Sequence, residues 1–314
     1  MKGLASLSID LDSLEHYHAI HGLPPPPPGP DPIYGRALER FGELCERLGL
    51  LGTAFAVGDR LSDPEAAAGV ARLARAGHEI GNHSYSHDYA LTRRHDVAVA
   101  EEVRRGSDAV RRATGSIPVG FRAPGYTLSA PLLRTLVAQG YRYDSSTFPA
   151  LPYWLAKAAV MGAMALSGRP SGAILDRARV LAAPRRPYRP DASEPYAVGN
   201  LPLLELPITT GLGGIPLMGT SVATLPGALS RALATGTRSL PLFNLELHAI
   251  DLLDASDASP ALATRQRDLR VPAAEKIARL AAFVGFLDRE WVPLAEAASR
   301  LGAGDPGSAP HAGA

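Results

Sequence analysis

The stretch His78-Glu79-Ile80-Gly81-Asn82-His83-Ser84-Tyr85-Ser86-His87-Asp88 combines a short strand pattern with two histidines that lie four residues apart. If the pair lies in a helical turn, His83 and His87 share one face, where both imidazoles can bind one divalent ion. Alone, the pair is a weak signal, because two solvated loop histidines are the simpler interpretation. The remainder of the chain must decide between the two interpretations.

A second apolar run, Ser6-Leu7-Ser8-Ile9-Asp10-Leu11-Asp12, contains two carboxylates near its end. Asp10 and Asp12 point to the same face of an extended strand, because side chains on a strand alternate between its two faces. One carboxylate can then bind an ion while the other stays free to act as a base. Together with the histidines, these residues suggest a metal site.

Strand-like and helix-like segments alternate along most of the chain. This alternation indicates parallel strands with crossover helices, and it places a site at the carboxyl edge of an α/β sheet. A barrel is favoured over an open sheet, because the candidate residues follow many strands and must converge. We expect strands at 4–11, 52–57, 78–82, 117–121, 141–144, 203–206 and 240–248, and helices at 35–48, 64–76, 96–113, 130–138, 225–234 and 273–287.

Residues 13–34 form a long connection that includes the run Pro24 to Pro28. Consecutive prolines favour an extended segment without backbone donors, so we expect a rim loop over the site. The connection also carries His16, His18 and His21. These histidines are either secondary ligands and substrate contacts or, more simply, solvated loop residues.

Residues 150–200 interrupt the alternation and are expected to form an insertion within a single domain. The segment 153–166 is apolar nearly all round and too short to span a bilayer, and the basic, proline-rich stretch 177–189 follows it. One interpretation is an ordinary buried helix with a surface loop. The alternative is an interfacial helix that makes peripheral membrane contact through 153–189 and reaches a lipid-linked substrate.

The composition of the 314 residues is that of a soluble globular protein, with 46% hydrophobic and 20% charged residues. The 32 basic and 31 acidic residues argue against a nucleic-acid partner. The one cysteine, Cys45, excludes an intramolecular disulfide, and no signal-peptide pattern precedes the first strand. We therefore expect a cytoplasmic protein, at most peripheral at the inner membrane face, with a catalytic barrel over 1–300 and a disordered tail over 301–314.

Taken in order, Asp10/Asp12, His83-x-x-x-His87, Arg122-Ala-Pro-Gly, Asp144 and His248 resemble the motifs of the polysaccharide deacetylase family, carbohydrate esterase family 4. The resemblance covers roughly residues 4–290. It implies a distorted, incomplete (β/α)7-type barrel and the metal-dependent removal of an N-acyl group, usually acetyl, from an amino sugar.

The resemblance also implies the metal ligands, which would be Asp12, His83 and His87 with a zinc ion in most relatives. From the residues alone, two histidines and one aspartate are compatible with Zn²⁺, Co²⁺, Ni²⁺ or Fe²⁺. A bound cation suits amide hydrolysis, because it lowers the pKa of water towards ~7.

The catalytic roles likewise follow from the resemblance. Asp10 would be the general base and Arg122 would hold it ionised and oriented. His248 would be the general acid, with its pKa raised by Asp144, and the backbone N–H of Gly125 would help to hold the oxyanion.

Several features depart from the common family pattern. The first motif is Asp-x-Asp rather than two adjacent aspartates, which looks like the branch that includes cytoplasmic-type peptidoglycan deacetylases and cofactor-free, allantoinase-like enzymes. Glu246 stands where the family often has a leucine in the acetyl pocket, so Glu246 either makes the pocket more polar or pairs with a neighbour such as Arg122. Tyr126 is a candidate substrate contact or a wall residue. The long segments 13–34 and 150–200 disfavour an open polymer as substrate.

The leading hypothesis is therefore a metal-dependent N-deacylase of an amino-sugar compound, with lipid-linked and nucleotide-linked precursors among the candidate substrates. One alternative is hydrolysis of another C–N bond, as in a formamido sugar or a cyclic amide. A second alternative is an inactive relative that binds a glycan or a membrane.

Overall fold

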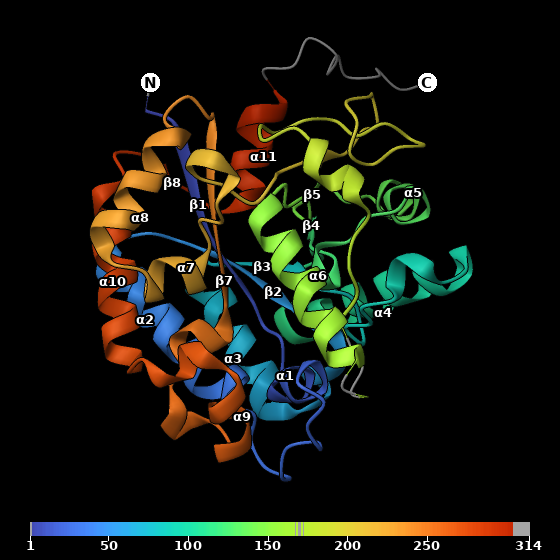
Figure 1. Cartoon of the computed structure of the whole chain (residues 1–314). Coiled ribbons are helices and arrows are strands. Elements are labelled where there is room, and N and C mark those ends of the chain that lie inside the picture. Colours follow the sequence, from blue (N-terminus) through green and yellow to red (C-terminus); the bar gives the residue numbers. More distant parts are fainter. Residues whose placement is uncertain (1, 167, 169–170, 172, 304–314) are drawn as a thin grey trace.

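A computed structural model describes residues 2–166, 168, 171 and 173–303 of the chain. Parallel strands in the order β6-β5-β4-β3-β2-β1-β7 form the central sheet, and β8 pairs with β1 (Figure 1). The strands are β1 (Leu4–Asp10), β2 (Thr53–Ala56), β3 (Glu79–Asn82), β4 (Gly120–Phe121), β5 (Tyr143–Asp144), β6 (Leu204–Glu205), β7 (Leu242–His248) and β8 (Glu290–Trp291). The α-helices are α1 (Leu14–Ile20), α2 (Leu38–Leu48), α3 (Pro64–Arg75), α4 (Asp96–Thr114), α5 (Ala130–Ala138), α6 (Leu151–Leu166), α7 (Gly219–Thr224), α8 (Gly227–Ala234), α9 (Pro260–Arg265), α10 (Ala273–Phe286) and α11 (Leu294–Gly302).

The sheet curls into an incomplete barrel. Its ladder pairings run from β6 to β7 without joining these two end strands. Single hydrogen bonds connect the two ends instead: the backbone N–H of Thr209 donates to the carbonyl of Asn244 at 3.1 Å, and the Asn244 side chain donates to the carbonyl of Leu206 at 3.2 Å. The predicted α/β fold, a distorted (β/α)7-type barrel, is confirmed.

Strand β1 pairs with β2, β7 and β8, and all seven of its residues are buried. It pairs with β7 in a register that runs from Leu4 opposite Leu242 to Asp10 opposite His248. Because the two strands are parallel, their carboxyl ends meet at one edge of the sheet. Asp10 and His248, which are far apart in the sequence, are thereby brought together.

Helix α2 shows how the helices cover the sheet. Its buried residues Leu38, Phe41, Leu44 and Cys45 recur every three or four positions, as expected for one apolar stripe on a helix. The helix ends at Gly49, whose φ of 64° is left-handed. Phe41 joins the largest core cluster, which also contains residues of β1, α3, β7 and α10.

The segment 13–34 is more ordered than we expected. Residues Leu14–Ile20 form helix α1, and the side chain of His16 accepts a hydrogen bond from the backbone N–H of Ser13 at 3.1 Å. Leu14 and Tyr17, three residues apart, are buried. The prediction of an irregular loop is therefore wrong for this part, whereas the proline run 24–28 does lie outside helices and strands.

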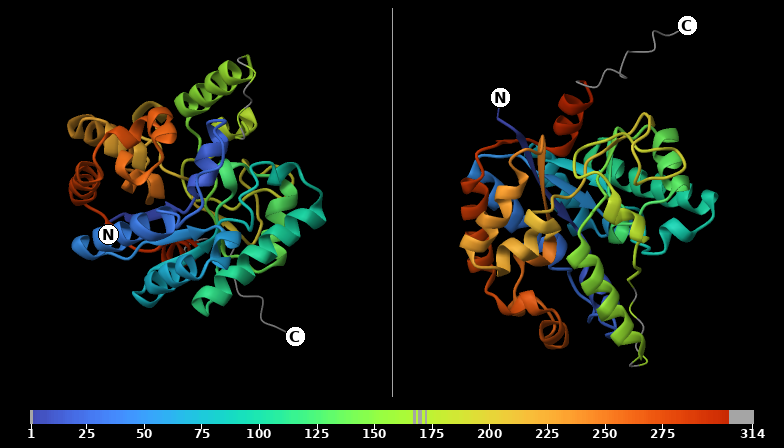
Figure 2. Two further views of the ribbon diagram at one scale, coloured as in Figure 1. Left: turned by 90° about the horizontal axis from the view of Figure 1, so that it is seen from below. Right: turned by 45° about the horizontal axis from the view of Figure 1, so that its top comes forward.

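Helix α6 begins the predicted insertion and lies beside α1 at the rim (Figure 2). None of its side chains is buried, and Leu155 and Leu166 are 54% and 93% exposed. The interpretation of 153–166 as an ordinary buried helix is therefore wrong. Among the described residues, no helix combines the length and the hydropathy needed to cross a membrane.

Helix α11 extends past the boundary that we expected for a disordered tail at 301–314. Leu301 and Gly302 belong to this helix, and Leu301 packs against a core cluster with Leu294 and Ala298. Residues 304–314 lie outside the described part of the chain.

Candidate active site

The loop after β3 positions the two predicted histidines. It is not the helical turn that we expected, since Ser84 and His87 have φ values of 64° and 54°. Such left-handed residues cost on the order of 1–3 kcal/mol each and persist where neighbouring groups fix them. Here the N–H of His87 donates to Ser84 Oγ at 3.1 Å, and the N–H of Gly58 donates to the Ser84 carbonyl at 3.0 Å. The loop still brings His83 and His87 together, with ring centroids 4.8 Å apart.

Asp12 lies between these two histidines. Its Oδ1 is 3.2 Å from Nε2 of His83 and 3.1 Å from Nε2 of His87, and all three side chains are buried. Burial opposes the charge of Asp12, but His87 and His83 outweigh burial and hold its pKa well below the ordinary value. One donor atom from each of the three residues lies within 4.8 Å of the others, so the group could hold one ion.

Two further observations fit this group to a divalent metal. Nδ1 of His83 lies 2.7 Å from the carbonyl oxygen of Arg122, so this nitrogen donates and leaves Nε2 free to act as a ligand. Among the described residues, neither ring nitrogen of the buried His87 has an aligned hydrogen-bond partner. An unsatisfied buried nitrogen is unfavourable, and a bound cation would satisfy it. Two imidazoles and one carboxylate suit Zn²⁺, Co²⁺, Ni²⁺ or Fe²⁺.

Arg122 connects the candidate metal ligands to the predicted base. Its fully buried guanidinium donates from Nη1 to Asp10 Oδ1 at 2.7 Å, from Nε to the Ser145 carbonyl at 2.8 Å and from Nη2 to Ser8 Oγ at 3.0 Å. Burial lowers the pKa of Arg122, but the Asp10 and Glu246 carboxylates more than compensate and raise it. Oδ2 of Asp10 has no hydrogen-bond partner among the described residues.

His248, at the end of β7, lies between a carboxylate and a phenol. Its Nδ1 is 3.1 Å from Oε1 of Glu246, and its Nε2 is 3.1 Å from the hydroxyl of Tyr126. Burial lowers the pKa of His248, but the negative charges of Glu246, Asp12 and Asp10 outweigh burial and raise it. These negative charges therefore favour the protonated imidazole.

Asp144 does not lie beside His248, and the prediction that it raises the pKa of His248 is wrong. Its carboxylate accepts hydrogen bonds from the N–H and Oγ of Ser146 at 3.1 and 2.9 Å, and burial raises its pKa. Glu246 occupies the position beside His248 that we expected for Asp144, because residues two apart on a strand share one face. Glu246 is also not among the residues that line the cavity described next.

Six of the predicted residues line a cavity of about 320 Å³ beneath α6: Asp10, Asp12, His83, Gly125, Tyr126 and His248. Gly125 and Tyr126 form part of its wall, in a turn where both have left-handed φ values of 66° and 63°. Helices α1 and α6 and the loop after β3 add further side chains, among them Tyr17, Tyr89, Tyr153 and Lys157, that we did not predict from the sequence. The only signal among them was Lys157, the single charge in an apolar segment. The buried hydroxyl of Tyr17 has no hydrogen-bond partner among the described residues.

The three histidines of segment 13–34 have different positions. The ring of His16 stacks on His87 with centroids 4.3 Å apart, and burial together with the neighbouring His87 lowers its pKa to about 3. His18 is buried and contacts Ser259 at 3.2 Å, and His21 contacts Gln266 at 2.7 Å at the cavity wall. His16 packs against His87, a candidate metal ligand, and the other two connect α1 to the segment around α9.

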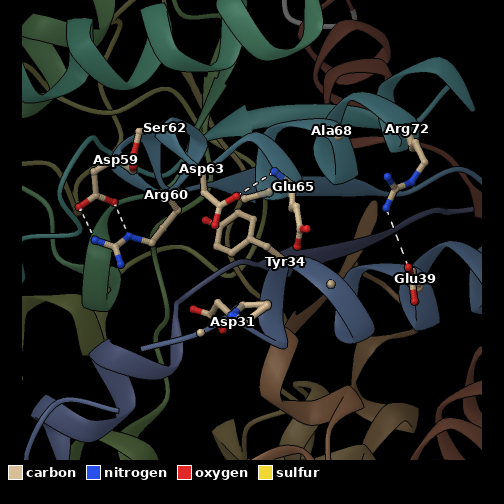
Figure 3. A pocket seen from close by; sticks show the side chains of 14 residues that line it. Asp31, Tyr34, Glu39, Asp59, Arg60, Ser62, Asp63, Glu65, Ala68 and Arg72 are labelled. Carbon is tan, nitrogen blue, oxygen red and sulfur yellow. Dashed lines mark hydrogen bonds and ion pairs between the residues drawn. The ribbon is translucent and has the colours of Figure 1, made fainter. Parts of the chain in front are cut away.

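A larger hollow of about 560 Å³ lies beside α3, away from the predicted residues (Figure 3). Its charged side chains already interact locally: Arg60 pairs with Asp59 at 2.9 Å, and Asp63 caps α3 by accepting from the Glu65 N–H at 2.8 Å. We therefore place the candidate active site in the smaller cavity.

Comparison with known proteins relates part of the chain to one family. The family model for polysaccharide deacetylase matches residues 31–143. A peptidoglycan deacetylase from Helicobacter pylori is 33% identical over 73 residues, which are 23% of this chain and 24% of that protein. The match thus spans about a quarter of that relative's length.

Solved structures show the same fold. A predicted polysaccharide deacetylase from Mycobacterium smegmatis superimposes with a TM-score of 0.60 at 18% identity, over 96% of this chain and 91% of that one. A carbohydrate esterase family 4 pseudoenzyme from Bacillus anthracis superimposes with a TM-score of 0.50 at 10% identity, over 95% of this chain and 66% of that one. Residues 31–143 thus match the polysaccharide deacetylase family, as the resemblance predicted, and the solved structures show that the same fold extends over nearly the whole chain.

Proposed function

We propose that the protein is a metal-dependent hydrolase that removes an N-acyl group, acetyl in the simplest case, from an amino-sugar compound. One observation carries the proposal: a carboxylate, Asp10, is held by Arg122 through one oxygen, and its other oxygen is free beside the metal-binding group. A protonated imidazole, His248, belongs to the same cavity wall. Hydrolysis of an amide needs both a base and an acid in such an arrangement.

The first half of the reaction depends on Asp10 and Arg122. An ion held by Asp12, His83 and His87 would polarise the acyl carbonyl and lower the pKa of water in the site. Asp10 accepts the proton of the attacking water at Oδ2, while Arg122 keeps the carboxylate ionised and oriented. The buried setting strengthens each of these charge interactions, because little water is present to screen them.

The second half depends on His248 and the turn at Gly125. The amine is a poor leaving group until it is protonated, and Nε2 of His248 carries the proton that it needs. Glu246 holds the opposite side of the imidazole at Nδ1. The backbone N–H of Gly125 donates to the oxygen of the tetrahedral intermediate, where a fixed donor stabilises developing negative charge.

The proposed substrate is a small precursor rather than an open polymer. Helices α1 and α6 both contribute to the cavity wall, which supports a substrate whose reacting end enters a confined space. We further propose a cytoplasmic site of action, with lipid-linked or nucleotide-linked sugars as substrates and peripheral membrane contact through 153–189. The exposed apolar side chains of α6 support this contact.

A substrate screen of the metal-loaded protein tests the proposal. The panel contains N-acetyl and N-formyl amino sugars, sugar nucleotides, chitin oligomers and peptidoglycan, and released acetate and formate are measured separately. We expect acetate from at least one small amino-sugar compound. Release of formate alone would favour hydrolysis of a formamido sugar. Turnover of polymers alone would contradict the proposed class of small substrates. No turnover with metal bound would indicate an inactive relative.

A further inference from the structure

Lys157 is the only charged residue of α6, and it lines the active-site cavity. The chain has only three lysines: Lys2 forms an ion pair with Asp288, and Lys276 is buried in α10. Among the described residues, Asp176 favours the charge of Lys157, but no carboxylate forms an ion pair with it. The charge of Lys157 is therefore available to a ligand.

The position of this charge relates it to the proposed reaction. A Cβ built on Gly125 would lie 3.8 Å from Nζ of Lys157, so the ammonium group is next to the turn that we assign to oxyanion binding. The ring of Tyr153 lies 5.7 Å from the same nitrogen. An anionic group bound by Lys157 would lie close to the reacting acyl group. We therefore expect both groups to belong to one sugar substrate.

Beyond Lys157, the same face of α6 is apolar. Val160, Met161 and Met164 line the cavity after Lys157, with the three- and four-residue spacing of one helical face. At 1.5 Å per residue, this strip continues for roughly 10 Å past the lysine. Ile20 of α1 lines the same cavity and adds apolar surface.

The cavity wall thus contains the proposed catalytic groups, next to them the cation of Lys157, and beyond Lys157 the apolar strip of α6. We propose that it binds a glycosyl phosphate whose phosphate carries an apolar chain, with the phosphate at Lys157 and the chain along Val160, Met161 and Met164. This inference rests on the proposed function, since the sugar must reach Asp10. Lysine is a common phosphate ligand, and a phosphodiester is the anionic group that joins a sugar to an apolar chain. A sugar nucleotide shares the phosphate, but the apolar side chains of Val160 and Met161 favour a hydrocarbon chain over a nucleoside.

Lysine footprinting tests binding without relying on turnover. Partial burial lowers the pKa of Lys157 to about 8, so an amine-reactive acylating reagent should modify it near that pH, and Lys2 serves as an internal control. We expect decyl phosphate to protect Lys157 but not Lys2, inorganic phosphate to protect it more weakly, and decyl maltoside to leave it reactive. Equal protection by decyl maltoside, or none by decyl phosphate, would overturn the proposal.

Variants test the two halves of the subsite. We expect Lys157→Met to weaken decyl phosphate binding by about 10- to 100-fold, the usual range for a lost charge-assisted contact, and Lys157→Arg to restore most of it. Met161→Ser should weaken decyl phosphate but not inorganic phosphate. Leu155→Ser, on the part of α6 that does not line the cavity, is the matched control and should change neither. A Met161→Ser variant that binds decyl phosphate like the wild type would overturn the apolar half.

Turnover then separates this inference from the proposed function. The three probes are N-acetylglucosamine 1-(decyl phosphate), UDP-N-acetylglucosamine and decyl N-acetylglucosaminide. We expect the first to have the highest kcat/KM, and Lys157→Met to reduce its preference over the neutral glycoside by about 10- to 100-fold. A preference for the sugar nucleotide would overturn the apolar-chain assignment. Protection of Lys157 without hydrolysis of any N-acyl sugar would support the subsite and contradict the deacylase proposal.

Discussion

Nη1 of Arg122 lies 2.7 Å from Oδ1 of Asp10, and Oδ2 of the same carboxylate has no hydrogen-bond partner among the described residues. One oxygen is therefore fixed while the other remains available, which is the arrangement that a general base requires. The carbonyl of Arg122 also accepts from Nδ1 of His83, so a single residue orients both the proposed base and a candidate metal ligand.

Asp10→Asn should abolish the base and keep the metal. The amide has nearly the shape of the carboxylate but cannot accept the proton, so kcat should fall by about 10²- to 10⁴-fold. Metal content by elemental analysis should stay at the wild-type value, because Asp10 is not part of the Asp12, His83 and His87 group. Loss of the metal, or activity within tenfold of the wild type, would contradict the assigned role.

Metal removal should abolish activity reversibly. We expect about one equivalent of metal in the wild type and little in His83→Ala or His87→Ala, because each variant loses one of three protein ligands. The exposed His95 supplies the control, and His95→Ala should retain its metal. A chelator should inactivate the wild type, and added Zn²⁺, Co²⁺, Ni²⁺ or Fe²⁺ should restore turnover. Full activity in metal-free protein would favour the cofactor-free C–N hydrolase alternative.

Glu246→Gln should change the pH profile on its alkaline side. The pKa of His248 is raised in the folded protein, so its acid form is present below that pKa and is lost as the pH rises through it. Replacing Glu246 removes a negative charge at 3.1 Å, which lowers the pKa of His248. The alkaline limb of kcat should therefore move to lower pH by roughly 1–2 units.

Asp144→Asn provides the comparison for the pH profile. Asp144 hydrogen-bonds to Ser146 rather than to His248, so this variant should leave the alkaline limb in place. An equal shift in both variants would contradict the assignment of Glu246 as the partner of His248.

Gly125→Ala should impair catalysis more than stability. A methyl group there would lie 2.8 Å from the Tyr89 ring, and the φ of 66° is unfavourable for alanine by roughly 1–2 kcal/mol. The displaced N–H should reduce kcat by about 10²-fold or more. Gly115→Ala is the matched control, because Gly115 has a φ of 79° and open space around it. It should lose a similar free energy of unfolding but retain full kcat, and equal loss of activity in both variants would contradict the role of the Gly125 N–H.

Local sequence patterns predicted most of the fold. The alternation of strands and helices, the apolar stripe of α2 and the placement of Asp10 and His248 at strand ends all follow from short-range periodicity. Helix α1 was missed because His16 and His18 occupy positions within its helical pattern, so its apolar spacing is weak. Strands β4, β5 and β6 are only two residues long, which is too short for a periodic signal to mark their ends.

The candidate site was predicted in composition but not in every pairing. The order of the family motifs assigned the carboxylate beside His248 to Asp144, whereas strand periodicity alone pointed Glu246 and His248 to the same face. The contributions of Tyr17 and Lys157 depend on how α1 and α6 pack over the sheet edge. Such packing between segments more than a hundred residues apart leaves no local trace in the sequence.

Because β1 pairs with β7, the residues of the candidate site become available at different times during translation. Asp10 is synthesised early, but its register partner His248 leaves the ribosome only after the intervening strands and helices have been made. At common elongation rates, roughly ten to thirty seconds separate the synthesis of His87 from that of His248. A growing chain therefore contains all three candidate metal ligands well before it contains the proposed acid. Under the proposed function, the site becomes complete only when β7, the last long strand, pairs with β1.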